Sequence, residues 1–436
     1  MSALFDLAGS KLGLKERLVC TKAFPKPEAL AIVAPVVAES REWDWTVTQA
    51  LCGLIEDAGD SIEQRWLAAD SPWRSSQLGR WLLAESWSRA GRKTDALALW
   101  GEIISAGGQA RAEALLARAR LRRDLNDLGG AFEDLHAASG LDESFAFLNK
   151  AARLLDRLTK VQPMPGKPMR IALLCSSTAD LLVPLLRLAC FREGFAAELY
   201  VAPYGSYRQE ILDPESGLYR FAPDVVIIGT HWRDAHLGAI GTGGAEQIEG
   251  LWKETVQSWQ NLLSRHTCMI LQHGFDLPRF DAGGYLSAAA LGGRARLLRE
   301  LNARLWRERP AGVVVVDLES LEAQVGLSIW EDPVQWHLAK QHPGSGALPA
   351  LVGRYGKLIR ARFGLSKKVL ALDLDNTLWG GVVGEDGVGG LQIGPPSAVG
   401  EAYAAFQSYV HELKERGILL AVCSKNNEAD AREPFR

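Results

Sequence analysis

Short apolar runs alternate with helical segments from residue 170 onward, and this alternation constrains the fold more than any other feature. The first run, Arg170–Cys175, is followed by an apolar helical segment at 181–191. Strand and helix in regular alternation are typical of a parallel α/β sheet. Further strands of this sheet are expected at 197–201, 224–229, 267–272 and 312–317.

Residues 1–160 have helical spacing instead, and part of it repeats. Ala96, Trp100 and Ile103 follow one another at intervals of about a helical turn. A weaker copy runs through Leu121, Ala131, Leu135 and Ala138. The offset is 131 − 96 = 35 residues, close to the period of about 34 in tetratricopeptide (TPR) helix pairs. This region is therefore predicted to be helical and TPR-like, and to dock a protein partner. A plain helical bundle with accidental spacing is the alternative.

Changes in the sequence pattern divide the chain into predicted domains. Prolines crowd the segment Val161–Pro168, which cannot continue a helix and is interpreted as a linker. An α/β domain is expected at 169–346, and a helix at about 348–363 leads into a second α/β unit at 367–436. The predicted fold class is α/β with a helical N-terminal region.

Composition excludes several classes of protein. The 436 residues include 49 Lys+Arg and 52 Asp+Glu, so a net charge of -3 gives no electrostatic support for binding nucleic acid or an anionic membrane. No apolar run reaches the roughly 18 residues that a membrane-spanning helix needs, and the start of the chain lacks the features of a secretory signal. The 6 cysteines form no CxxC pair, which argues against a zinc ribbon or a disulfide framework. We expect a soluble, cytoplasmic protein.

The strongest chemical signal follows the apolar run Val369–Leu372, which leads directly into Asp373 and Asp375. Residues two apart on a strand face the same side, so both carboxylates are expected to project from the carboxyl end of a buried parallel strand, where open α/β sheets bind ligands. Two close carboxylates repel each other unless a cation or a proton lies between them. Mg²⁺ is suitable because it prefers oxygen ligands and can share its coordination with a phosphate. One carboxylate could then attack phosphorus while the other moves protons.

A strand–helix–strand crossover is expected in the same unit. The segment after the acidic pair is amphipathic, with Phe406 and Val410 on its apolar face, and Gly417 ends it. A second strand is expected at 418–423, followed by Ser424, whose hydroxyl could hold a phosphoryl oxygen.

Asp373-Leu-Asp-Asn-Thr377 resembles the DxDxT first motif of the haloacid dehalogenase (HAD) superfamily, and Ser424 resembles its second motif. The longer stretches 372–387 and 419–427 closely resemble the FkbH-like branch, subfamily IIIC. The stretch Tyr204–Tyr219 is similar to the N-terminal domain of that branch, so the resemblance extends over about residues 170–436. A chance DxD sequence at a strand end is the alternative.

The resemblance implies roles at the matching positions. Asp373 would be the nucleophile and a Mg²⁺ ligand, and Asp375 would be the general acid/base with its backbone carbonyl on the metal. A flap from Trp379 to Gly387 would close over the site. The implied substrate-binding residues are Thr377, Ser424, Lys425 and Asn426.

Members of this branch load a glyceryl unit from 1,3-bisphosphoglycerate onto an acyl carrier protein and remove the phosphate, which supplies polyketide biosynthesis. The resemblance therefore implies a Mg²⁺-dependent phosphatase and transferase whose partners are an acyl carrier protein and a phosphorylated three-carbon substrate. A thioester on an enzyme cysteine belongs to that activity, and Cys423 is the candidate here. A buried structural thiol is the alternative for this residue.

The sequence departs from the family pattern after the Ser-Lys-Asn-Asn motif. A lysine and an acidic pair are expected there, and the residues up to Arg436 contain neither family motif. We therefore expect a truncated or frameshifted product with little phosphoryl-transfer activity, unless Lys425 substitutes for the missing cation. A non-catalytic interaction protein remains the alternative.

Residues 169–346 resemble the SGNH hydrolase fold with degraded motifs. Ser176 follows Leu174-Cys175 where the family has Gly-Asp-Ser, and the late motif Asp332…His337 has a gap of five instead of three. If Ser176 and His337 met as nucleophile and base, this domain would be an esterase. His273 is expected to be a loop or carrier-binding residue and not a catalyst. The histidines expected at the surface are His231, His236 and His342.

Overall fold

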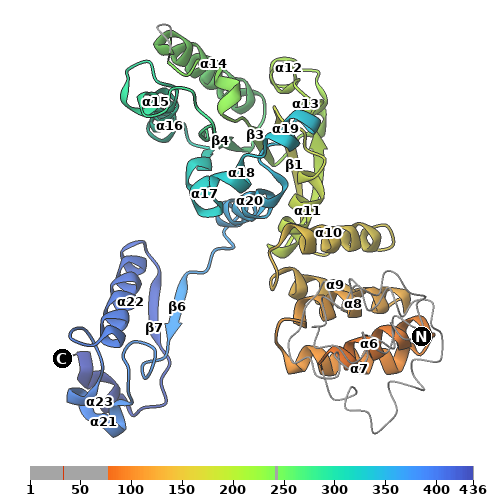
Figure 1. The fold of residues 1–436 in the computed structure, drawn as a ribbon, viewed down its shortest axis with the longest axis vertical. Helices are drawn as coiled ribbons and strands as arrows, with labels where there is room; N and C mark the ends of the chain where they lie inside the picture. Colours follow the sequence, from red (N-terminus) through yellow and green to blue (C-terminus); the bar gives the residue numbers. More distant parts are fainter. Residues whose placement is uncertain (1–32, 34–76, 241–243, 436) are drawn as a thin grey trace, which may run out of the picture. The chain divides into compact units, whose positions relative to one another are not determined.

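The computed structural model describes Val33, residues 77–240 and residues 244–435 (Figure 1). The helical prediction for residues 1–32 and 34–76 lies outside the described residues. The chain divides into two compact units, Met1–Lys357 and Leu358–Arg436. In the described part of the chain, no helix has the length and apolar character needed to cross a membrane.

Helices form the N-terminal part of the first unit, which confirms the predicted helical region over the residues described. Their bounds are α6 (Gln77–Arg89), α7 (Lys93–Ala106), α8 (Arg111–Asp124), α9 (Leu128–Ser139) and α10 (Phe145–Thr159). Ala96 of α7 and Ala131 of α9 are both completely buried, so the 35-residue offset relates equivalent small residues in successive helix pairs. The assignment to the TPR class stays a prediction.

A five-stranded parallel sheet with the order β2-β1-β3-β4-β5 occupies the middle of the first unit. Its strands are β1 (Lys167–Cys175), β2 (Phe195–Val201), β3 (Val225–Gly229), β4 (Met269–His273) and β5 (Val313–Val316). Every residue of β3 and β4 is buried, as expected for central parallel strands with both faces covered. The predicted strands and the α/β fold class are confirmed.

Successive strands are added on opposite sides of β1: β2 lies on one side, and β3, β4 and β5 lie on the other. The switch point of the sheet is therefore between β1 and β3. Parallel sheets bind ligands at such a switch point, beside the carboxyl ends of the strands. Figure 1 shows the helices that surround this sheet. They are α11 (Leu182–Arg192), α12 (Tyr207–Leu212), α13 (Gly217–Phe221), η3 (Trp232–Ala235), α14 (Gly244–Arg265), α15 (Leu286–Ala289), α16 (Arg294–Glu308), α17 (Leu318–Val325), α18 (Leu327–Trp330), α19 (Pro333–Ala339), η4 (Ser345–Ala347) and α20 (Leu348–Arg362).

One hydrophobic core of the first unit lies between the sheet and the helices α14 and α16. Trp259 of α14 and Leu301 of α16 are buried there against β-strand residues such as Ile270. Burial of such large side chains contributes roughly 1.5–3 kcal/mol each. This core fixes the loops that follow β3 and β4.

The second unit contains a parallel pair of strands, β6 (Val369–Leu372) and β7 (Leu419–Val422). Its remaining elements are α21 (Val383–Gly390), α22 (Ala398–Glu415), α23 (Glu428–Arg432) and η5 (Glu433–Phe435). The strand–helix–strand crossover is therefore present, with α22 between the strands as the sequence predicts.

The prediction that the first strand of this unit is buried is wrong. Val369 of β6 is 54% exposed and Leu419 of β7 is 66% exposed. On α22, Val410 is buried but Phe406 remains partly exposed. A continuous apolar run indicates a strand that can be covered on both faces, whereas its actual exposure depends on how much packs against it. Among the described residues of this unit, few large side chains cover the sheet.

Candidate functional site

Asp373 and Asp375 lie at the carboxyl end of β6. Asp373 directly follows the strand and is exposed, whereas Asp375 is partly buried. Between them, Leu374 is completely buried and packs with Leu378 and Trp379 in a small core. Neighbouring residues of an extended segment turn their side chains to opposite sides. Burial of Leu374 on one side therefore leaves the side chains of Asp373 and Asp375 on the other.

The Asp375 carboxylate is held on both oxygens. Its Oδ1 accepts hydrogen bonds from Trp379 Nε1 (3.1 Å) and the Val383 backbone N–H (3.1 Å). Its Oδ2 accepts one from Asn426 Nδ2 at 2.7 Å. Partial burial alone would raise the pKa of Asp375, but these hydrogen bonds, led by the one from Asn426, lower it overall. The three hydrogen bonds therefore fix the orientation of the Asp375 carboxyl group.

The Asp373 carboxylate accepts fewer hydrogen bonds than that of Asp375. Its Oδ1 accepts a hydrogen bond from the Leu374 backbone N–H at 2.8 Å. Within the described residues its carboxylate makes no other hydrogen bond or ion pair. An exposed carboxylate with free lone pairs can accept a ligand without losing an existing contact, so Asp373 is the open group of this site.

Of the other predicted site residues in the described chain, Asn426 contacts a carboxylate of the site, whereas Lys425 does not. Asn426 does so through Asp375, and its backbone N–H also donates to Ser424 Oγ at 3.1 Å. Lys425 is exposed, and its side chain contacts neither carboxylate in the described part of the chain. Cys423 is exposed, so the alternative of a buried structural thiol is wrong. Thr377 acts locally: its backbone N–H donates to Leu374 O at 3.1 Å.

The predicted flap begins as a loop at Trp379 and continues into α21, and backbone hydrogen bonds close its base. Gly380 and Gln392 exchange two backbone hydrogen bonds, of 3.0 and 2.8 Å. Asn376 has a φ of 52°, and its Oδ1 accepts from the Gly381 backbone N–H at 3.1 Å. Sequence reasoning assigned Trp379 to this flap and missed its contact with Asp375. An aromatic N–H donor four residues after an acidic residue was the available signal.

A metal ion at this site would have few protein ligands. Among the described residues, no group of three or more His, Cys, Asp or Glu side chains could hold one. The Asp373 carboxylate and the backbone carbonyl of Asp375 offer oxygen ligands to a hard cation. Mg²⁺ fits such a set because it keeps several waters and often takes one or two carboxylates together with substrate phosphate.

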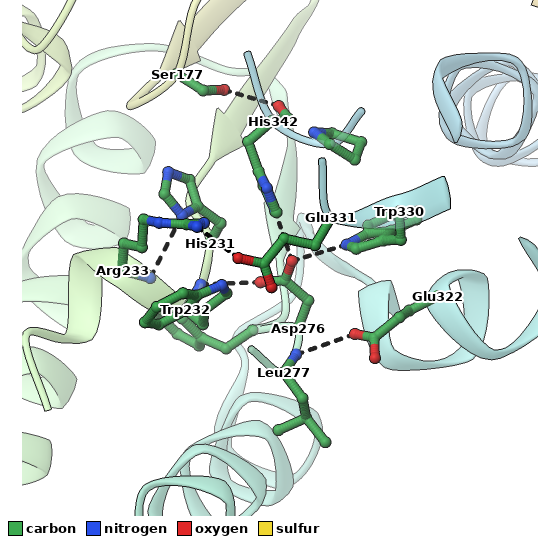
Figure 2. A network of polar contacts seen from close by, with 12 residues as sticks. Ser177, His231, Trp232, Arg233, Asp276, Leu277, Glu322, Trp330, Glu331 and His342 are labelled. Atoms are coloured by element: carbon green, nitrogen blue, oxygen red, sulfur yellow. Dashed lines mark hydrogen bonds and ion pairs between the residues drawn. The ribbon is translucent and has the colours of Figure 1, made fainter. Parts of the chain in front are cut away.

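The first unit contains a second cluster of polar residues, centred on Asp276 (Figure 2). Asp276 follows β4 and is completely buried. Its carboxylate accepts hydrogen bonds from the Trp232 backbone N–H (2.9 Å), Trp330 Nε1 (2.7 Å) and His342 Nε2 (2.5 Å). Burial alone would raise the pKa of Asp276, but the contact with His342 outweighs it and holds the pKa well below its usual range. Asp276 is thus an ionised carboxylate with hydrogen bonds on both oxygens.

Two histidines expected at the surface belong to this cluster, so that expectation is wrong for them. His231 is 3% exposed and His342 is 7% exposed, whereas His236 is exposed as expected. The cause is the sheet, whose buried strands bring the loops at their carboxyl ends together. Burial, followed by repulsion from His342, lowers the pKa of His231 well below its ordinary value.

His273 is also misplaced by the sequence analysis, which expected a loop. It is the last residue of β4 and is buried. One ring nitrogen, Nδ1, is 2.9 Å from Thr230 O, and the other, Nε2, is 2.5 Å from the Tyr355 hydroxyl. Burial lowers the pKa of His273 to about 4. This residue therefore joins β4 to α20 as a neutral side chain.

The Ser176–His337 pair that an esterase would require is not formed. Ser176 Oγ donates to Asp234 Oδ2 (2.7 Å) and to the Gly229 backbone carbonyl (3.2 Å). His337 lies on α19, which has no buried residue, and no hydrogen bond joins it to Ser176 in the described chain. The neighbouring Ser177 donates to the backbone carbonyl of His342 at 2.9 Å, not to its ring. An esterase in this domain would therefore lack its nucleophile–base contact.

Comparisons with known proteins give one informative similarity. No protein-family model matches this chain, and no curated protein does. The fold is similar to the crystal structure of the N-terminal part of the protein BF1531 from Bacteroides fragilis, which contains a phosphatase domain complexed with Mg. That similarity has a TM-score of 0.58 at 28% sequence identity and covers 65% of this chain and 76% of the other. It confirms the α/β class and supports a HAD-like phosphatase.

A second structure, LpoA from Haemophilus influenzae, aligns at 7% identity with a TM-score of 0.20, covering 99% of this chain and 69% of the other. A score this low indicates no shared fold.

Proposed function

We propose that this chain is a Mg²⁺-dependent phosphatase of the HAD type, with Asp373 as its nucleophile. The observation that carries the proposal is the pair of carboxylates at the tip of β6. Asp375 is held by three donors, while Asp373 keeps free lone pairs. The similar structure with a phosphatase domain and Mg supports the same chemistry.

The reaction follows from what each carboxylate is free to do. The Asp373 carboxylate attacks phosphorus, the bond from phosphorus to the leaving oxygen breaks, and an aspartyl phosphate forms. Asp375 in its protonated form gives its proton to the leaving oxygen. It then takes a proton from the water that attacks the aspartyl phosphate, which releases inorganic phosphate and restores Asp373. Bound Mg²⁺ would neutralise charge on the phosphoryl oxygens.

For the natural substrate we propose the reaction of the FkbH-like branch, glyceryl transfer from 1,3-bisphosphoglycerate to an acyl carrier protein. The Cys423 thiolate would attack the acyl carbon and release the 1-phosphate, and the thiol of the carrier would then take the glyceryl group from the thioester. The remaining phosphate ester would be hydrolysed through Asp373. The exposure of Cys423 at the end of β7 supports this proposal, because an acylated thiol must reach a second protein.

Two experiments test these proposals. Phosphate release from p-nitrophenyl phosphate at saturating Mg²⁺ should be slow, because no third acidic side chain joins the site among the described residues. Asp373→Asn should abolish it, whereas Asp430→Asn, an exposed change in the same unit, should not. Equal turnover by wild type and Asp373→Asn would contradict the phosphatase proposal. For the transfer, intact mass after mixing with 1,3-bisphosphoglycerate should show a glyceryl adduct that Cys423→Ala removes.

A further inference from the structure

We propose that a groove beside α9 binds a protein partner, through a segment in which a large apolar side chain lies next to a lysine or arginine. The groove has a volume of about 670 Å³, within the range of roughly 300–1,000 Å³ for ligand sites. Its walls come from α9, from the linker before β1 and from α11 and the turn that follows it. The lining residues are Gly129, Phe132, Glu133, His136, Gln162, Pro165, Gly166, Phe191 and Gly194. This inference does not depend on the phosphatase function proposed above.

Two phenylalanines form the floor of the groove. Phe132 is 4% exposed and Phe191 is 5% exposed, whereas the other lining residues are all exposed. The centroids of the two rings are 5.8 Å apart, and the ring planes meet at 51°. The His136 ring lies edge-on to Phe191 at 5.7 Å, and its Nε2 is 3.1 Å from the Arg192 backbone carbonyl oxygen. Aromatic side chains held in this way offer a fixed apolar surface to a large side chain of the partner.

Glu133 gives the groove its charge. It is exposed, and within the described residues its carboxylate makes no hydrogen bond or ion pair. Apart from His136, no other ionisable side chain lines the groove in the described chain. The nearest cation on α11, Arg192, is already paired with Glu143 at 3.1 Å. A lysine or arginine of the partner is therefore the group that complements this surface.

Gly129 indicates that the fold leaves the groove open. Glycine is less stable than alanine inside a helix, so a helical glycine calls for a reason. The neighbouring Gly130 has one in packing, because a Cβ there would collide with Asp127 Oδ2. A Cβ at Gly129 would meet no atom within 4 Å, and Gly129 does not have a positive φ. Neither packing nor backbone conformation requires this glycine, and its missing side chain leaves room in the groove.

The open walls suit a segment of a protein better than a free small molecule. A site for a small molecule usually encloses about 70–90% of the ligand surface. Here the walls at Gly166 and Gly194 consist of exposed main chain only, so the main chain of a partner can approach them closely. The sequence repeat predicts that the helical region docks a partner, and the groove gives this prediction a location.

The experiment selects phage-displayed heptapeptides on the immobilised full chain and measures the enriched peptides, synthesised with a fluorescent label, by anisotropy. We expect the enriched sequences to share a large apolar residue beside lysine or arginine. Gly129→Leu should fill the groove and weaken their binding at least about 10-fold. Gly250→Leu is the matched control, because Gly250 is an exposed glycine of α14 outside the groove whose Cβ would also meet no atom within 4 Å.

A second pair of variants tests the charge. Glu133→Gln should weaken binding of the same peptides about 2–5-fold, because an exposed ion pair contributes modestly. Glu102→Gln, an exposed change on α7 outside the groove, should match wild type.

Peptides that bind wild type and Gly129→Leu equally would show that the groove is not their site. Enrichment of acidic or purely apolar sequences would contradict the partner chemistry, and no enrichment over an uncoated surface would overturn the whole proposal. Thermal unfolding checks that Gly129→Leu is folded. If it is not, Glu133→Lys decides the question, since this exposed change should abolish the preference for lysine and arginine, and unchanged binding would refute the assignment.

Discussion

Asp276→Asn should destabilise the first unit strongly although it changes little in volume. The carboxylate of Asp276 is completely buried and accepts from Trp232, Trp330 and His342. An amide in its place offers one oxygen and one NH₂ group. Since the indole N–H of Trp330 and the backbone N–H of Trp232 can only donate, at least one of them must then face another donor.

The magnitude follows from these contacts. A buried donor left without a partner costs about 1–3 kcal/mol, and breaking a buried charge pair costs about 3–5 kcal/mol. His342 can change tautomer and accept from the new NH₂ group, which recovers part of the second cost. We therefore expect a loss of about 3–5 kcal/mol for Asp276→Asn, a large part of the 5–15 kcal/mol that stabilises a typical domain.

Urea unfolding followed by tryptophan fluorescence measures this loss. Asp213→Asn is the control, because Asp213 is exposed and accepts one backbone hydrogen bond, from the Glu215 N–H at 2.9 Å. Its change in unfolding free energy should stay within about 0.5 kcal/mol. A loss below about 1 kcal/mol for Asp276→Asn would refute the view that this carboxylate anchors the loops around it.

Three further predictions concern the pH dependence of stability and a close backbone approach. Burial lowers the pKa of His273 to about 4. The free energy of unfolding should therefore fall as pH drops from about 6.5 towards 4, because the unfolded chain binds the proton first. In urea titrations, His273→Gln should reduce this pH dependence. Burial raises the pKa of Glu322 to about 7. Its contribution to the free energy of unfolding is therefore present at low pH and lost as pH rises through about 7. Glu322→Gln should remove this part of the pH dependence. Gly400→Ala should lower the melting temperature of the second unit, because a Cβ there would collide with the backbone carbonyl of Gly394, whereas Gly384→Ala, with open space around it, should not.

The sequence analysis predicts the sheet of the first unit well, for a physical reason. Central parallel strands are covered on both faces, so a run such as Val225–Gly229 must be apolar throughout and is visible without any structure. The same reasoning overstates the burial of β6 and β7. An apolar run shows that a strand can be buried, but it does not show how many side chains pack against it. Leu419, 66% exposed, is the clearest case.

The polar clusters are harder to predict because they join residues distant in sequence. His342 and Asp276 are 66 positions apart, and neither lies in a recognisable local spacing. Because His342 has no metal-ligand spacing in the sequence, it is expected at the surface, where unpaired polar residues are usually found. The topology of the sheet brings these loops together, and a single sequence does not display that topology at the level of side chains.

Asp375 shows the boundary between the two cases. Its position after an apolar run is a local feature, and the sequence predicts it. Its partner Asn426 follows the second strand of the same crossover, so the sequence predicts that both residues lie at one edge. It does not predict that the amide contacts the carboxylate, since that depends on side-chain geometry.

The two clusters differ in how far their carboxylates are satisfied, and this difference assigns their roles. Asp276 is completely buried and accepts hydrogen bonds on both oxygens, so a new ligand would have to open the cluster and disturb donors whose loss costs about 1–3 kcal/mol each. Asp373 is exposed and accepts one backbone hydrogen bond, so a ligand gains its contact without such a loss. Chemistry in this chain is therefore expected at the tip of β6, with the Asp276 cluster maintaining the loops of the first unit.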